Sequence, residues 1–231
     1  MEKIAASRFL PNDFMSSEAL KILRTNLMFS GEDVKVIGIT SFGASEGKST
    51  ISFQLAASIA QMGKRVLLMD ADLRKSALQS RLKVQGKIEG LSHYLTGMAN
   101  VNELMHGTDV PGLFIMFAGV RVPNAAELLG SNSFKKLIPA LRDVFDYVIV
   151  DAAPLGQVID CAVIAPELNG TAIVIDANKN SYKLERRLQS QLEKSGGKIL
   201  GVILNRVNFR DKSNYYGRAY GYSYSYGENE E

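Results

Sequence analysis

One stretch, residues 40–50, limits more than any other what this chain of 231 residues can fold into. It reads TSFGASEGKST, follows an apolar run at 34–39 and precedes a helical pattern at 51–60. Small residues between a buried strand and a helix let backbone N–H groups converge on phosphate oxygens, and the helix dipole adds positive potential. The pattern therefore predicts a phosphate-binding loop and, with it, nucleotide binding.

Within this loop, Lys48 is expected to reach the β- and γ-phosphates, and the Ser49 hydroxyl to ligate Mg²⁺. The loop is a variant, because the common form has its first glycine at the position of Phe42. The alternative is a chance Gly-Lys-Ser-Thr at a helix N-terminus, which both flanking elements argue against. The residues expected to bind the nucleotide here are Gly43, Ala44, Ser45, Glu46, Gly47, Lys48, Ser49 and Thr50.

Composition narrows the class of protein. With 46% hydrophobic and 22% charged residues, the chain suits one α/β domain with a large core. A net charge of +3 with dispersed basic residues argues against a nucleic-acid partner. The single Cys161 excludes an intramolecular disulfide, and no leader or membrane-length apolar run is recognisable. We therefore expect a cytoplasmic protein without direct membrane insertion.

Two further apolar runs end in acidic residues. The run at 65–69 is followed by Asp70 and Asp72, and the run at 147–150 by Asp151. Open α/β sheets bind ligands outside the carboxyl ends of their strands, so we expect these carboxylates beside the phosphate loop. There they could hold Mg²⁺ waters or accept a proton from an attacking hydroxyl. A turn cap is the alternative for Asp70.

The rest of the chain alternates between buried strands and helices. Strands are expected at 113–117, 171–175 and 199–204, and longer helices at 133–144 and 181–194. This alternation predicts an α/β fold with a doubly wound, mainly parallel sheet flanked by helices. Asn205 follows the last strand and is placed to reach a nucleotide base, with a turn residue as the alternative.

The N-terminal segment, 1–15, is expected to be an extended arm before a domain at 16–210. Ser16 or Ser17 could cap the helix that follows. Three charged residues lie along one face of that helix, and their spacing alone favours a solvated face over a subunit contact. These residues are Glu18, Lys21 and Arg24.

Residues 211–231 differ in character from everything before them. They combine tyrosines with Gly, Ser, Asn and Glu, and lack an apolar period, which predicts a disordered and accessible tail. A sticky low-complexity segment is the plain alternative. Attached to a nucleotide-binding domain, the repeated phenols suggest phosphate acceptors, namely Tyr215, Tyr216, Tyr220, Tyr222, Tyr224 and Tyr226.

Together these motifs resemble the bacterial protein tyrosine kinases of capsule and exopolysaccharide synthesis, of the cytoplasmic kind whose transmembrane activator is a separate polypeptide. The family's P-loop, Ser-x-x-Pro-Gly-Glu-Gly-Lys-Ser, is matched at Ser41 and at 46–49. Its Asp-x-Asp-x-Arg motif is matched at 70–74, and its apolar run ending in Asp at 148–151. Its Glu-x-x-Arg-x-x-Arg, Pro-Asn-Pro-x-Glu-Leu-Leu and tyrosine-cluster motifs correspond to 18–24, 123–129 and 215–226.

The resemblance implies a deviant Walker P-loop fold and an autokinase that uses ATP and Mg²⁺ to regulate polysaccharide synthesis and export. Lys48 would hold the phosphates, Asp70 would be the base, and the metal would be held by Ser49, Asp72 and Asp151. The helix motif at Glu18, Lys21 and Arg24 would make oligomer contacts in a ring, for which eight subunits is one candidate size. Further implied partners are a transmembrane activator or chain-length determinant, which would recruit the enzyme to the inner face of the membrane, and a cognate tyrosine phosphatase.

Some positions depart from the family pattern. Ala44 and Ser45 replace Pro-Gly, which predicts a less preorganised loop, and Lys21 replaces an arginine and loses its bidentate fork. Residues 152–154 replace a Thr or Ser and two prolines.

Two rival functions remain open. One is a partitioning or cell-division-positioning ATPase. Its signature lysine would fall at position 43, where this chain has glycine, and the sequence shows no basic amphipathic C-terminal helix for a membrane surface. A non-catalytic nucleotide-binding scaffold of polysaccharide assembly is the other.

Overall fold

A computed structural model of the chain describes residues 3–179 and 182–207. They form one seven-stranded sheet with the order β3-β4-β2-β5-β1-β6-β7. All neighbouring strands are parallel except β3 and β4, which confirms the predicted doubly wound, mainly parallel α/β fold. The strands are β1 (Val36–Ser41), β2 (Val66–Asp70), β3 (His106–Gly107), β4 (Leu113–Met116), β5 (Tyr147–Asp151), β6 (Gly170–Asp176) and β7 (Ile199–Asn205).

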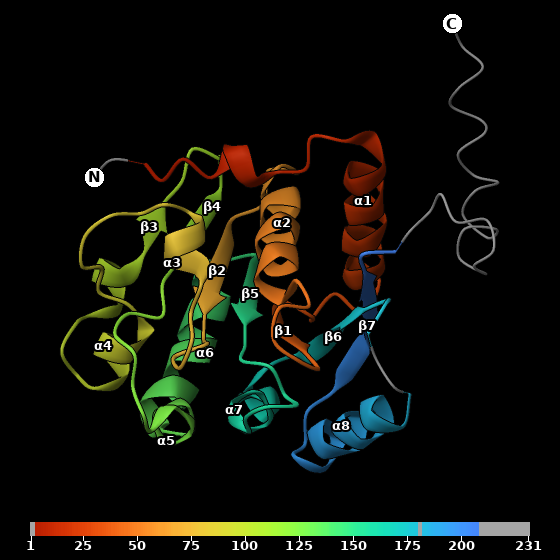
Figure 1. Ribbon diagram of the computed structural model, residues 1–231. Helices are drawn as coiled ribbons and strands as arrows, with labels where there is room; N and C mark the ends of the chain where they lie inside the picture. Colours follow the sequence, from red (N-terminus) through yellow and green to blue (C-terminus); the bar gives the residue numbers. More distant parts are fainter. Residues whose placement is uncertain (1–2, 180–181, 208–231) are drawn as a thin grey trace, which may run out of the picture.

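Helices cover both faces of the sheet, with α1 and α2 on one side and α5, α7 and α8 on the other (Figure 1). The first face carries α1 (Phe14–Met28), α2 (Lys48–Ala60) and α3 (Leu78–Arg81). The second carries α4 (Leu91–Leu95), α5 (Ala125–Leu129), α6 (Asn132–Val144), α7 (Asp160–Ile164) and α8 (Tyr182–Lys194). Short 3₁₀ helices lie at Ser7–Phe9, Val101–Leu104 and Ala165–Glu167. In the described ranges, no helix combines the length and the apolar character needed to cross a membrane.

The central strands are mostly apolar because both of their faces are covered, and most of their polar residues lie at or near the carboxyl ends. Every residue of β1, β2 and β6 is buried, as is typical of parallel sheets between two helical layers. Successive side chains point to opposite faces. In β5, for example, Val148 and Val150 enter the core under α4–α8, whereas Ile149 enters the core under α1–α3.

The N-terminal residues are fixed against the sheet edge. Ile4 forms a bridge with Thr108, and the Asp109 carboxylate accepts the Ser7 N–H at 2.9 Å. The predicted cap at Ser16 or Ser17 is wrong. The helix α1 begins earlier, because Asp13 is the N-cap and its carboxylate accepts the Ser16 N–H at 2.8 Å.

Candidate functional site

Strand register brings the predicted acidic residues together. β5 lies between β1 and β2, and Asp70 at the end of β2 is the register partner of Asp151 at the end of β5. The loop that follows β1 leads directly into α2, which begins at Lys48. Three strand ends therefore meet the phosphate loop at the carboxyl edge of the sheet, where open α/β sheets bind ligands.

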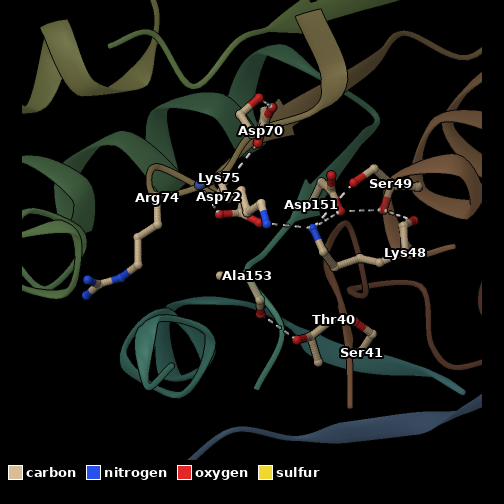
Figure 2. A network of polar contacts seen from close by, with 12 residues as sticks. Thr40, Ser41, Lys48, Ser49, Asp70, Asp72, Arg74, Lys75, Asp151 and Ala153 are labelled. Atoms are coloured by element: carbon tan, nitrogen blue, oxygen red, sulfur yellow. Dashed lines mark hydrogen bonds and ion pairs between the residues drawn. The ribbon is translucent and has the colours of Figure 1, made fainter. Parts of the chain in front are cut away.

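Lys48 lies at the centre of this cluster (Figure 2). Its Nζ donates to Asp151 Oδ1 at 2.9 Å and lies 3.7 Å from Asp72 Oδ2. Burial lowers the pKa of Lys48, but the charges of Asp151, Asp72 and Asp70 outweigh that effect and raise the pKa above its ordinary value. The ammonium group is therefore charged at neutral pH and ready to meet phosphate oxygens.

The oxygen ligands around the Lys48 ammonium group are of the kind that bind a hard divalent cation. Lys48 Nζ contacts the Ser49 hydroxyl at 3.4 Å as well as Asp151 and Asp72, so the three groups predicted for Mg²⁺ already converge on one positive charge. Among residues 3–179 and 182–207, no cluster of three or more His, Cys, Asp or Glu residues could hold a metal ion by itself. Mg²⁺ commonly takes only one or two carboxylates together with substrate phosphates, and this donor set suits that mode.

Asp70 has the chemistry of a proton acceptor. Its side chain is buried, its Oδ2 accepts the Ser76 hydroxyl, and its Oδ1 accepts the Asp72 N–H at 3.1 Å. Burial raises the pKa of Asp70 to about 7, with a further increase from the Asp151 charge, while Ser76 and Lys48 oppose the shift. A carboxyl group with a pKa near the working pH can exchange protons efficiently with a substrate.

Side chains in and next to the phosphate loop form hydrogen bonds with its backbone. The Glu46 carboxylate is buried and accepts the Gly43 N–H at 3.0 Å, while the Ser41 hydroxyl donates to the Gly43 carbonyl at 2.7 Å. Within the loop, two residues adopt left-handed backbone angles, Ser45 with φ 63° and Gly47 with φ 95°. Ser45 stands where the family pattern has glycine, so the chain holds this turn without the residue that favours it.

Asn205 lies against this loop from the end of β7. Its Nδ2 donates to the Glu46 carbonyl at 2.8 Å, and a Cβ atom at Gly47 would lie 2.1 Å from the same nitrogen. The amide therefore braces the loop backbone in this structure. Its predicted contact with a base stays a prediction.

We expect Gly47→Ala to weaken nucleotide binding by about tenfold or more, because a methyl group would displace Asn205 and strain a left-handed residue. Titration with a fluorescent ADP analogue would measure the affinity. Gly63→Ala is the matched control. Gly63 also has a positive φ, of 79°, but a Cβ there would meet none of the described atoms within 4 Å. Equal losses of affinity in the two variants would contradict the role assigned to the Asn205 contact.

The ion pair between Arg74 and Asp160 fixes the segment that carries Asp72, and the sequence did not reveal it. Arg74 donates through Nε and Nη2 to the two oxygens of Asp160, at 2.7 and 3.0 Å. Asp160 is buried at the start of α7. The family motif contains this arginine, but its partner lies 86 residues away in the sequence. No local sequence pattern therefore indicated that the two residues would pair.

The three predicted oligomer-contact residues share α1 but differ in surroundings. Glu18 and Lys21 form an ion pair on the helix surface. Arg24 turns toward α2, where its Nη1 donates to the Ser58 carbonyl at 3.0 Å. Arg24 thus helps to hold α1 against α2. The predicted phosphate-acceptor tyrosines, 215–226, lie outside the described residues.

Comparisons with protein families, known sequences and solved structures find proteins similar to this chain. The AAA domain family matches residues 34–187. The tyrosine-protein kinase CpsD of Streptococcus agalactiae is 41% identical over 193 residues, which cover 84% of this chain and 84% of CpsD. The kinase domain of the Escherichia coli tyrosine kinase ETK has a TM-score of 0.78 and 31% identity, covering 84% of this chain and 78% of that one. The septum site-determining protein MinD of Pyrococcus horikoshii, at 23% identity and TM-score 0.65 over 78% and 73% of the two chains, is similar in fold.

Proposed function

The chain belongs to the AAA domain family and, within it, to the bacterial tyrosine-protein kinases that include CpsD, and we propose that it transfers the γ-phosphate of ATP to tyrosines of its own C-terminal cluster. The acceptors would be Tyr215, Tyr216, Tyr220, Tyr222, Tyr224 and Tyr226. The transfer would take place between subunits, and its role would be to regulate capsule or exopolysaccharide synthesis.

The observation that carries this proposal is the buried cluster at the carboxyl edge of the sheet, in which Lys48 pairs with Asp151 and Asp70 lies beside Asp151. Phosphoryl transfer depends mainly on positioning and on neutralising phosphate charge. Lys48 supplies positive charge beside the phosphate loop. A phenol has a pKa of about 10, so a carboxyl group titrating near neutral pH can accept its proton as the new bond forms. Asp70 is the residue to which we assign this role.

Mg²⁺ would be held by Ser49, Asp72 and Asp151 together with phosphate oxygens, and would neutralise the charge of those oxygens. The loop residues from Gly43 to Thr50 would bind the phosphates, and Asn205 would face the nucleoside. Lys48 would then exchange its contact with Asp151 for the β- and γ-phosphates.

The proposed assembly is a ring of subunits in contact through α1, with eight as one candidate number. Exposed apolar residues support this proposal, because Phe14 and Ile22 lie on the helix that carries Glu18, Lys21 and Arg24, and Phe29 is its C-cap. Scattered apolar residues are normal on surfaces, but three on one helix and its C-cap suit a contact with another protein. A separate transmembrane activator would recruit the enzyme from the cytoplasm to the inner face of the membrane, and a tyrosine phosphatase would reverse the reaction.

The intact mass of the protein after incubation with MgATP tests the proposed function. We expect mass increases of one phosphate each, in the protein alone or with the cytoplasmic segment of its activator. The matched control replaces the six tail tyrosines by phenylalanine and keeps Tyr94, Tyr147 and Tyr182. This variant should gain no phosphate. ATP hydrolysis without any mass increase in the wild type would instead favour a nucleotide-dependent switch, and binding without hydrolysis a scaffold.

A further inference from the structure

Arg206, directly after β7, joins the phosphate loop to the neighbouring strand β6. Its Nη1 donates to Asp176 Oδ2 at 2.7 Å, and its Nη2 donates to the Ser45 carbonyl at 2.8 Å. Ser45 and Arg206 are 161 residues apart in sequence. One guanidinium group therefore ties the loop to the carboxyl ends of two strands that pair with each other.

The anchor for this contact is well fixed. Asp176 is the last residue of β6 and is 2% exposed, and the N–H of Asn178 donates to its Oδ1 at 3.1 Å. That N–H, with the guanidinium of Arg206, holds the pKa of Asp176 below its usual value, so the carboxyl is ionised at neutral pH. The backbone of Arg206 is also held, because Asn178 Nδ2 donates to its carbonyl at 3.2 Å.

The loop residue at the other end needs support. Ser45 has a φ of 63°, a left-handed conformation that carries a steric cost for a residue with a Cβ atom. The family pattern has Pro-Gly at Ala44 and Ser45, in which glycine removes this cost and proline restricts the residue before it. This chain has neither, and the Arg206 contact falls on the Ser45 carbonyl.

The contact also orients the loop's donors. In a trans peptide, the carbonyl of one residue and the N–H of the next point in opposite directions. Because Arg206 binds the Ser45 carbonyl and Asn205 binds the Glu46 carbonyl, the N–H groups of Glu46 and Gly47 are turned away from β7. Successive N–H groups oriented in this way form the concave anion site of a phosphate loop.

We propose that Arg206 is a positioning residue for nucleotide binding, which stabilises the phosphate loop in place of the missing Pro-Gly. This inference rests on nucleotide binding and goes beyond the proposed kinase reaction. It concerns how the loop is prepared for phosphate, and Arg206 is not assigned any contact with the transferred group.

Equilibrium titration with a fluorescent ADP analogue, which requires no phosphoryl transfer, tests the proposal. We expect Arg206→Ala to weaken binding by about tenfold, as for the loss of one hydrogen bond from a charged group. Adding Ser45→Gly to this variant should restore most of the affinity, because glycine adopts the loop conformation without help. Arg206→Lys should give an intermediate loss, since one ammonium cannot reproduce the fork that reaches two separate oxygens.

Lys179→Ala is the matched control. Lys179 forms an ion pair with the same Asp176 oxygen, at 3.6 Å. Within the described part of the chain it has no hydrogen bond or ion pair with the loop, so its removal should change affinity by less than about twofold. Unchanged affinity in Arg206→Ala, an equal loss in Lys179→Ala, or a failure of Ser45→Gly to restore binding would each overturn the proposal. If Arg206→Ala did not fold, Arg206→Lys with and without Ser45→Gly would decide the question. A protein that binds ADP as expected but transfers no phosphate would contradict the proposed function alone.

Discussion

Lys48→Met should lower the rate of tyrosine phosphorylation by about 10²- to 10³-fold or more, as for the loss of a preorganised charge at a transferring group. The structure gives the reason. The ammonium of Lys48 is buried beside the phosphate loop, 2.9 Å from Asp151 and 3.7 Å from Asp72. A methionine fills similar space without charge, so the site would lose the buried positive charge beside the phosphate loop. Transfer of labelled phosphate from ATP to the protein is the measurement.

The same substitution should also destabilise the free protein at neutral pH. Removing Lys48 leaves buried carboxylates without their counter-charge, which costs about 3 kcal/mol in comparable buried pairs. The loss of stability should shrink as the pH is lowered and the carboxyl groups become protonated. Chemical denaturation at two pH values would measure it.

Lys35→Met is the matched control for both effects. Lys35 is exposed and precedes β1, at the opposite end of the strand from the phosphate loop. The Lys35→Met variant should retain the phosphorylation rate and the stability of the wild type. If Lys48→Met retained activity, the assignment of this cluster as the phosphoryl-transfer site would be wrong.

The fold and the positions of the acidic residues could be predicted because they depend on local patterns. Continuous apolar runs in an α/β alternation are typical of buried parallel strands, and parallel strands place their carboxyl ends at one edge. Asp70 and Asp151 could therefore be assigned to the site before their register was known. Burial is the main cause of the raised pKa of Asp70, and its pairing with Asp151 adds to it; that pairing depends on the strand order and could not be predicted locally.

The features that were missed depend on contacts between distant residues or on closely balanced local choices. β3 has two residues and exists only through its pairing with β4, so no periodicity could indicate it. The N-cap of α1 was misassigned because Asp, Ser and Thr are all good caps, and three such candidates stand within five residues. The left-handed backbone of Ser45 has no sequence signal of its own, and its support by Arg206 appears only in three dimensions.

Asp70→Asn should lower the rate of phosphorylation by roughly 10²- to 10⁴-fold, the usual contribution of a general base. Nucleotide affinity should remain within a few-fold of the wild type, because Asp70 is not among the groups that contact Lys48 directly. In the wild type, kcat/KM should fall as the pH falls through about 7, where Asp70 becomes protonated and can no longer accept the phenol proton. The asparagine variant should lack this dependence.

Ser76→Ala provides the control for this assignment. The Ser76 hydroxyl donates to Asp70 and lowers its pKa. Its removal should therefore move the acid limb of kcat/KM to higher pH without abolishing transfer. An acid limb that stays in place in Ser76→Ala, or that persists in Asp70→Asn, would show that another group controls the reaction.

Stability gives an independent test of the same carboxyl group. Because folding raises the pKa of Asp70 from 3.8 to about 7, the folded state binds more protons than the unfolded state between these values, and its stability decreases as the pH rises through that window. Above pH 7 the folded protein must bury an ionised carboxylate, which Asp70→Asn avoids. The variant should therefore melt at a higher temperature than the wild type at pH 8, and the difference should diminish as the pH falls from 7 toward 4. A difference independent of pH would mean that Asp70 does not titrate in this range, and that its role as the base must pass to another residue.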